Sequence, residues 1–124
     1  MTAPVLSLIV LSVALSAFAQ VVLKLGMSAG AVSRALADGG AAQVAWAVAS
    51  EWRVLAGLAL YLASAAAWLF VLARLQVSAA YPFVGLGFVL TLLFGWWWLG
   101  DTVSAQRIVG TLLVAAGVVL VARS

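Results

Sequence analysis

The sequence contains no cysteine, no histidine and few charged residues. Of its 124 residues only 7% are Asp, Glu, Lys or Arg, whereas 68% are hydrophobic. Without thiols and imidazoles, the chain cannot build a Cys/His metal centre, a cysteine nucleophile or a Ser-His-Asp relay. It also lacks the Gly-rich loop with a following Lys that cradles nucleotide phosphates. We therefore expect no catalytic residue, no metal, no cofactor and no enzyme activity.

The small surplus of positive charge does not indicate a nucleic-acid-binding protein. Six basic and three acidic residues give a net charge of +3. The basic residues are scattered among apolar stretches, so they do not form the basic face that nucleic acids require. No nucleic-acid partner is expected.

Long hydrophobic runs make up most of the sequence. A water-soluble fold of this composition could not cover its surface with polar groups. A membrane-spanning helix needs about 20 apolar residues, and a barrel strand would alternate in polarity, which these runs do not. We predict an all-α integral membrane protein, a four-helix bundle forming a single domain over residues 1–124. Its helices are expected at about 4–25, 54–73, 79–99 and 106–122.

The connection over residues 26–52 is long and rich in Ala and Gly. It carries Arg34, Asp38 and Glu51, and from about 31 to 49 it is compatible with a short helix lying in the membrane interface. A disordered loop is the open alternative.

Basic residues are more numerous at one membrane end than at the other. With four spans, the first and third connections lie on the same side, which by the positive-inside rule is the cytoplasm. The margin is small enough that insertion in both orientations remains open. The residues of the richer side are Lys24, Arg34, Arg53 and Arg107, and those of the other side are Arg74 and Arg123.

The polar residues of the richer end suit an anionic ligand. Gln20 and Lys24 are four residues apart on one helix face, with Gln20 about 6 Å deeper in the membrane, and Arg53 is expected at the depth of Lys24. Arg and Lys are the usual phosphate-binding side chains. All three acids fall in connections or at helix ends, whereas a proton-coupled cation exporter needs a carboxylate inside the membrane. Asp101 is expected to cap the last helix or to pair with Arg107.

Four helices are too few to enclose a path for a polar head group. Many transporters consist of two inverted repeats with the site between them, which an antiparallel dimer of short chains would reproduce. Gly110 and Gly117, seven residues apart, form a flat stripe suited to helix contact. We expect this stripe to contact a second subunit, either another copy or a related chain. Helix contact within the monomer is the alternative.

Several short motifs occur together from the second predicted helix onward. The motif residues are Gly57-Leu-Ala-Leu-Tyr61, Trp68, Val77-Ser78-Ala79-Ala80-Tyr81-Pro82, Gly100-Asp101, Val103-Ser104, Gly110 and Gly117-Val118. This pattern resembles one half of a drug/metabolite transporter, in particular the four-helix, small multidrug resistance-like branch. Within that branch it is most similar to the flippase subunits for aminoarabinose linked to undecaprenyl phosphate, and Gln20 with Lys24 is similar to their Gln…Lys pattern.

The resemblance implies a flippase for a polyprenyl-phosphate-linked sugar or aminosugar in the bacterial inner membrane. Lys24 and Arg53 would hold the phosphate, and Gln20 would hydrogen-bond the phosphate or the sugar. Snorkelling of the two cations to the interface is the alternative. Three aromatic residues are expected to line the path of the sugar, with a purely structural role as their alternative. These are Trp68, Tyr81 and Phe83.

Departures from the family bear on the choice of function. Drug exporters of this type carry a membrane-embedded Glu where this chain has Ser16, and the family's Ser and Asn after the Tyr-Pro pair are Gly85 and Gly87 here. A proton-coupled exporter of small organic cations is therefore the second candidate function rather than the first. A non-transporting membrane partner of a glycosyltransferase is the third.

Overall fold

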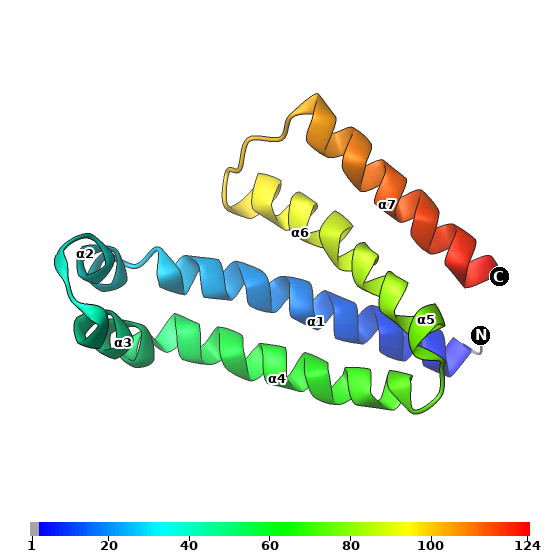
Figure 1. Cartoon of the computed structure of the whole chain (residues 1–124), viewed down its shortest axis with the longest axis horizontal. Coiled ribbons are helices and arrows are strands. Elements are labelled where there is room, and N and C mark those ends of the chain that lie inside the picture. The colour runs from blue at the N-terminus through cyan, green and yellow to red at the C-terminus, as the bar shows by residue number, and fades with distance from the viewer. Residues whose placement is uncertain (1–2) are drawn as a thin grey trace.

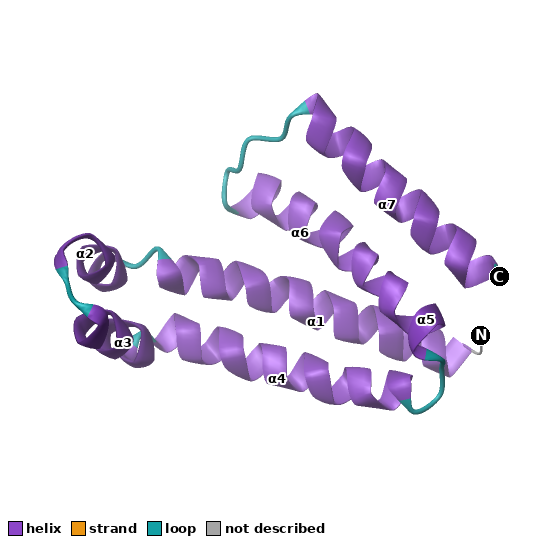
Figure 2. Ribbon diagram, viewed as in Figure 1, coloured by secondary structure: helices purple, strands orange, loops and turns teal. Residues whose placement is uncertain are grey.

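The computed structural model describes residues 3–124, and every regular element within that range is helical (Figures 1 and 2). This confirms the predicted all-α class. In chain order the elements are α1 (Ala3–Met27), α2 (Gly30–Asp38), α3 (Ala41–Ser50), α4 (Trp52–Leu72), α5 (Val77–Ala80), η1 (Tyr81–Phe83), α6 (Val84–Trp98) and α7 (Ala105–Arg123).

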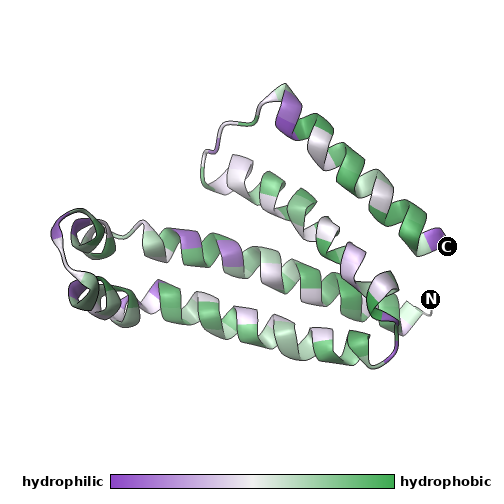
Figure 3. Cartoon of the chain, in the orientation of Figure 1, coloured by the Kyte–Doolittle hydropathy of each residue, from purple (hydrophilic) through white to green (hydrophobic). Residues whose placement is uncertain are grey.

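Four of the helical segments are long and apolar enough to cross a membrane. They are α1, α4, the continuous stretch Val77–Trp98 made of α5, η1 and α6, and α7. Each lies within a few residues of a predicted span, because the length of an apolar run fixes the length of a spanning helix. Hydrophilic residues concentrate at the helix ends and in α2 and α3 (Figure 3).

The spanning helices lie in a row, in the order α4, α1, α6, α7 (Figure 1). α1 packs along α4 on one side and against α6 on the other, whereas α4 and α6 hardly touch. The buried core joins the amino-terminal half of α1 to the end of α4 and to η1, through residues such as Ile9, Val71 and Phe83. Towards the opposite end, α6 and α7 diverge from the α1–α4 pair (Figure 1).

Two glycines set how closely the helices approach. A Cβ on Gly57 of α4 would lie 2.7 Å from Leu23 Cγ of α1. A Cβ on Gly85 of α6 would lie 2.8 Å from Val114 Cγ1 and 2.9 Å from Val118 Cγ2 of α7. These distances are too short for a side chain, so each glycine permits a helix contact that a larger residue would push apart.

The connection between the first two spans forms two short helices, so neither a single helix nor a disordered loop describes it. Both α2 and α3 run across the ends of α1 and α4, and are seen end-on in Figure 1. Val32 of α2 is fully buried, whereas Arg34 and Asp38 are exposed. Trp46 of α3 is 75% exposed, as expected for an aromatic anchor at a membrane interface.

The turn between α6 and α7 corrects the predicted role of Asp101. Gly100 has a φ of +68°, a conformation that glycine adopts most readily, and the Asp101 N–H donates to the Gly95 carbonyl at 2.9 Å. The cap of α7 is instead Ser104, whose Oγ accepts from the Arg107 N–H at 3.1 Å. Nor does Asp101 pair with Arg107: within residues 3–124 the single ion pair joins Arg53 to Glu51. Asp101 lies three residues too early to cap the helix.

Candidate substrate groove

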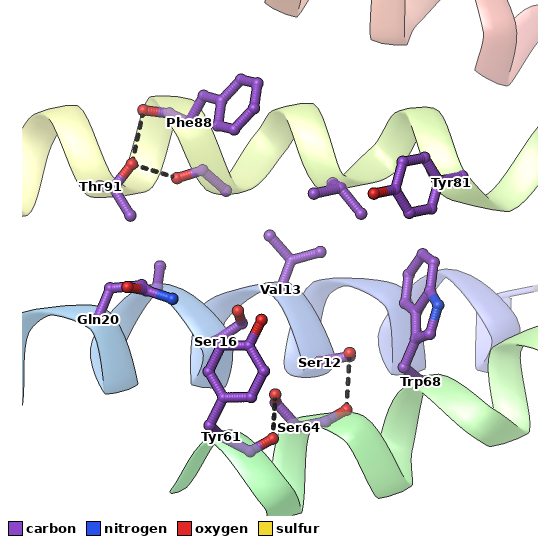
Figure 4. A pocket seen from close by; sticks show the side chains of 13 residues that line it. Ser12, Val13, Ser16, Gln20, Tyr61, Ser64, Trp68, Tyr81, Phe88 and Thr91 are labelled. Atoms are coloured by element: carbon purple, nitrogen blue, oxygen red, sulfur yellow. Dashed lines mark hydrogen bonds between the residues drawn. The ribbon is translucent and has the colours of Figure 1, made fainter. Parts of the chain in front are cut away.

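A groove of about 640 Å³ lies between α4 and α6, with α1 as its floor. It exists because α1 packs against both helices while they hardly touch each other. Figure 4 shows side chains from all three helices converging on it. Its lining residues come from α1 (Ser12, Val13, Ser16, Ala17, Gln20), α4 (Tyr61, Ser64, Trp68), and η1 with α6 (Tyr81, Val84, Gly87, Phe88, Thr91).

A polar stripe runs along the floor of the groove. Ser12, Ser16 and Gln20 are each four residues apart on α1, so they lie on one face of the helix. Lys24 continues the same spacing one turn, about 6 Å, beyond Gln20. Of the residues in this stripe, the sequence alone had indicated only Gln20 and Lys24 as candidate binding residues. The regular four-residue spacing of the two serines is the signal that would have identified the rest.

Some hydroxyl groups of the groove already donate their protons to the backbone. Ser12 Oγ donates to the Ser64 carbonyl at 3.0 Å, and Ser64 Oγ donates to the Tyr61 carbonyl at 2.7 Å. Thr91 Oγ1 donates to the Gly87 carbonyl at 2.8 Å. The first of these bonds ties α1 to α4 inside the membrane. These hydroxyls therefore stabilise the walls, and only their lone pairs face a ligand.

The remaining polar groups are available to a ligand. Within residues 3–124 no hydrogen bond is formed by the side chains of Ser16, Gln20, Tyr61, Trp68 or Tyr81. Together they offer hydroxyl and amide groups, which both donate and accept hydrogen bonds, and an indole N–H, which only donates. The groove lining contains no charged side chain. The described part of the chain also holds no group of His, Cys, Asp and Glu that could bind a metal.

The groove brings together three of the six predicted substrate-binding residues. Gln20, Trp68 and Tyr81 line it, from three different elements. Phe83 does not: it is 3% exposed and belongs to the hydrophobic core. The reason is geometric, since each residue of a 3-10 turn rotates about 120° around the axis, so Tyr81 and Phe83, two residues apart, point about 120° apart and face different directions.

The two predicted phosphate-binding cations lie beyond the groove lining. Lys24 is exposed near the end of α1. Arg53, at the start of α4, lies at the same end of the molecule, since a Cβ on Gly26 would be 3.2 Å from its carbonyl carbon. The Arg53 guanidinium is 5.6 Å from the centroid of the Trp52 ring, and its Nε is 3.9 Å from Glu51 Oε1. Lys24 is therefore the cation that continues the polar stripe without an acidic neighbour of its own among the described residues.

Comparison with known proteins identifies the class of this four-span membrane protein. The family model described as Small Multidrug Resistance protein matches residues 41–114, which is more than half of the chain. The chain therefore belongs to this family, and the resemblance seen in its motifs is confirmed. Together with the four apolar helices, this makes it a multi-pass protein of the bacterial inner membrane. No solved structure matches the chain.

Curated proteins that are similar to this chain are named as two subunits, ArnE and ArnF, of one kind of flippase. A probable 4-amino-4-deoxy-L-arabinose-phosphoundecaprenol flippase subunit ArnE of Pseudomonas paraeruginosa is 41% identical over 87 residues, or 70% of this chain and 71% of its own. An ArnE of Pseudomonas aeruginosa is 43% identical over 75 residues, covering 60% and 64% of the two chains. The subunit ArnF of Photorhabdus laumondii is 36% identical over 72 residues, covering 56% and 57%.

Proposed function

We propose that this chain is a subunit of a flippase that moves a polyprenyl-phosphate-linked aminosugar across the inner membrane. The observation that carries the proposal is an uncharged, hydrogen-bonding groove within the membrane whose polar stripe leads to Lys24. The names of the relatives support the same class of substrate. Transport then needs no covalent chemistry, and so no catalytic residue.

The groove suits a sugar better than an organic cation. Sugar hydroxyls both donate and accept hydrogen bonds, and the groove offers both functions through groups such as Ser16, Gln20 and Tyr61. Aromatic rings of Trp68 and Tyr81 add flat apolar surface for a sugar ring. A cation would find no carboxylate in the lining with which to exchange a proton.

The phosphate is assigned to the basic end of the groove. With the sugar in the groove and Gln20 bonding the sugar or the phosphate, the phosphate reaches Lys24 one turn further along α1. Arg53 contributes a second positive charge from α4, partly offset by Glu51. The polyprenyl tail remains in lipid, beside the open side of the helix row.

Replacing Lys24 tests this assignment. Lys24→Ala is expected to slow movement of the aminosugar lipid by about tenfold to 100-fold, because it removes a charge-assisted bond to phosphate. Lys24→Arg should retain most of the rate. The measurement is the accessibility of labelled lipid in vesicles that contain the chain together with its related subunit. Arg34→Ala is the matched control, since Arg34 is an exposed cation at the same membrane end and does not line the groove. A normal rate for Lys24→Ala would remove the phosphate site.

Export of small organic cations is the second candidate function, and family membership favours it. It predicts resistance to quaternary ammonium compounds and a substrate-linked pH change in vesicles. A flippase instead changes the exposure of a lipid-linked sugar on the outer leaflet. Resistance of cells that express the chain and a substrate-linked pH change in vesicles, without a change in the exposure of the lipid-linked sugar, would favour the exporter.

We further propose that a second subunit completes the groove, either another copy in antiparallel orientation or a related small chain. The row of helices leaves the groove open at its side, and Tyr61 and Tyr81 are 44% and 63% exposed. On α7, neither Gly110 nor Gly117 has any atom within 4 Å of an added Cβ. Their stripe is therefore accessible to a helix of the partner.

Blocking the stripe is expected to weaken association. Gly110→Leu combined with Gly117→Leu should lower the cross-linked dimer fraction in lipid by at least about fivefold, because leucine keeps a partner backbone from approaching closely. Gly40→Leu is the control, since Gly40 also has open space around it but lies between α2 and α3. Unchanged dimer formation by the double variant would show that the contact lies elsewhere.

A further inference from the structure

A second, smaller hollow lies between α6 and α7, close to the turn that joins them. Its volume is about 310 Å³, and it is separate from the groove described above. Unlike the groove, it contains charged residues of both signs. Its lining consists of Phe88, Thr91 and Leu92 of α6, Asp101 of the turn, and Arg107 and Thr111 of α7.

The two charges of this α6–α7 crevice are available to a ligand. Asp101 and Arg107 are both exposed and are not within ion-pair distance of each other. The Arg107 guanidinium uses one N–H, on Nη1, to donate to the Thr102 carbonyl at 2.9 Å. That bond holds the side chain at the crevice and leaves its other donors available. The crevice therefore offers an anion site and a cation site within one small volume.

The uncharged polar groups of the crevice are biased towards accepting hydrogen bonds. Thr111 Oγ1 donates its proton to the Arg107 carbonyl at 2.8 Å. Thr91 Oγ1 likewise donates to the carbonyls of Gly87 and Phe88, at 2.8 and 3.1 Å. Both hydroxyls can then only accept hydrogen bonds, and the Asp101 carboxylate is likewise only an acceptor. An ammonium group, which has only donors, complements these acceptors, whereas Arg107 complements a phosphate.

The crevice and the groove are neighbours on α6. Phe88 and Thr91 line both of them. A head group bound in the crevice would therefore need to pass only these side chains to enter the groove.

We propose that the α6–α7 crevice is the access site at which a zwitterionic head group is first bound, its ammonium by Asp101 and its phosphate by Arg107. This inference rests on the proposed flippase function, and it adds the reason for selecting an amine-bearing sugar. The uncharged groove binds the sugar by hydrogen bonds. The crevice distinguishes an amine from a hydroxyl before the head group reaches the groove.

The test compares two lipids that differ only in the sugar substituent. One is the aminopentose phosphoundecaprenol, and the other carries a hydroxyl in place of the amine. The wild-type chain with its related subunit should move the amine lipid faster. Asp101→Asn is expected to reduce that preference about tenfold, to near equality, by removing the carboxylate. Asp101→Glu should keep the preference, and Arg107→Gln should slow both lipids alike because both carry the phosphate.

Two exposed residues of α2 provide matched controls. Asp38→Asn and Arg34→Gln remove the same charges at the same membrane end, but neither residue lines the crevice. Both control variants should keep the wild-type rate and preference. If Asp101→Asn preferred the amine lipid over the hydroxyl lipid as strongly as the wild-type chain does, the access site would be overturned and the flippase proposal would stand. Failure of the wild-type chain to move either lipid would overturn both.

Discussion

Introducing a carboxylate into the groove, by Ser16→Glu, is expected to inhibit lipid movement at neutral pH. Ser16 lies on the groove floor, eight residues or about 12 Å from Lys24. A negative charge at that distance from the bound phosphate repels it by about 1.4 kcal/mol at an effective dielectric constant near 20, or roughly tenfold in rate, and its attraction for the sugar's ammonium would hold the head group in the groove instead of letting it cross. Lowering the pH should restore movement, because the protonated carboxyl is neutral. The pH profile of lipid accessibility in vesicles measures both effects.

Ser16→Gln separates charge from size in this experiment. Gln has nearly the shape of Glu but carries no charge, so any loss it causes should not depend on pH. Ser16→Glu should also bind a quaternary ammonium probe that the wild-type groove does not, since a carboxylate is the group that the cation exporters of the family place there. Identical pH profiles for the two variants would show that charge in the groove does not select the substrate.

The spans were predictable because their signal is long and simple. Apolar runs of about 20 residues specify spanning helices irrespective of how those helices pack. The connection between Gly26 and Trp52 has no such signal. Its apolar stretches are short and interrupted by Gly39 and Gly40, so neither their helicity nor their break into two helices followed from composition. Their packing against α1 and α4 then decides the conformation.

The site was only partly predictable, because it depends on which helix faces meet. The aromatic motif singled out Tyr81, which lines the groove, but the 3-10 turn that follows Ala80 sends Phe83 into the core. Ser12 and Ser16 were not selected because single serines are common in apolar helices, where they bond their own backbone. Here Ser12 bonds the backbone of the neighbouring helix at Ser64. That contact between distant segments is invisible before the helices are placed.

The bonds formed by the charged residues near the α6–α7 turn were likewise not predictable from the sequence. Asp101 and Arg107 are six residues apart, which suggested a cap or an ion pair. The turn instead places Ser104 at the cap and directs the Arg107 guanidinium to the Thr102 carbonyl. Both charges thereby remain available on the wall of a crevice. A short sequence separation therefore identified which residues are neighbours but not which bonds they form.

Filling the groove at Gly87 with a large side chain should slow transport without unfolding the protein. Gly87 lines the groove, and a Cβ there would be 3.7 Å from Val13 Cγ1, an ordinary van der Waals distance. Gly87→Ala therefore fits, and it should raise stability by about 0.5–1 kcal/mol because glycine is a poor helix former. Gly87→Leu adds bulk in the sugar's place, where a steric cost of about 1.4 kcal/mol or more to the bound head group slows transport roughly tenfold or more.

The decisive readout for Gly87 is the separation of stability from transport. Thermal unfolding in detergent should show Gly87→Ala at least as stable as the wild-type chain and Gly87→Leu still folded, whereas lipid accessibility should be near normal for Gly87→Ala and strongly reduced for Gly87→Leu. Gly85→Leu should behave differently, since its Cβ would lie within 3 Å of two valine side chains of α7 and must separate α6 from α7. Normal transport by a stable Gly87→Leu protein would mean that the head group travels outside this groove. The two glycines lie two residues apart on α6, so this contrast tests the face of the helix and not only its sequence.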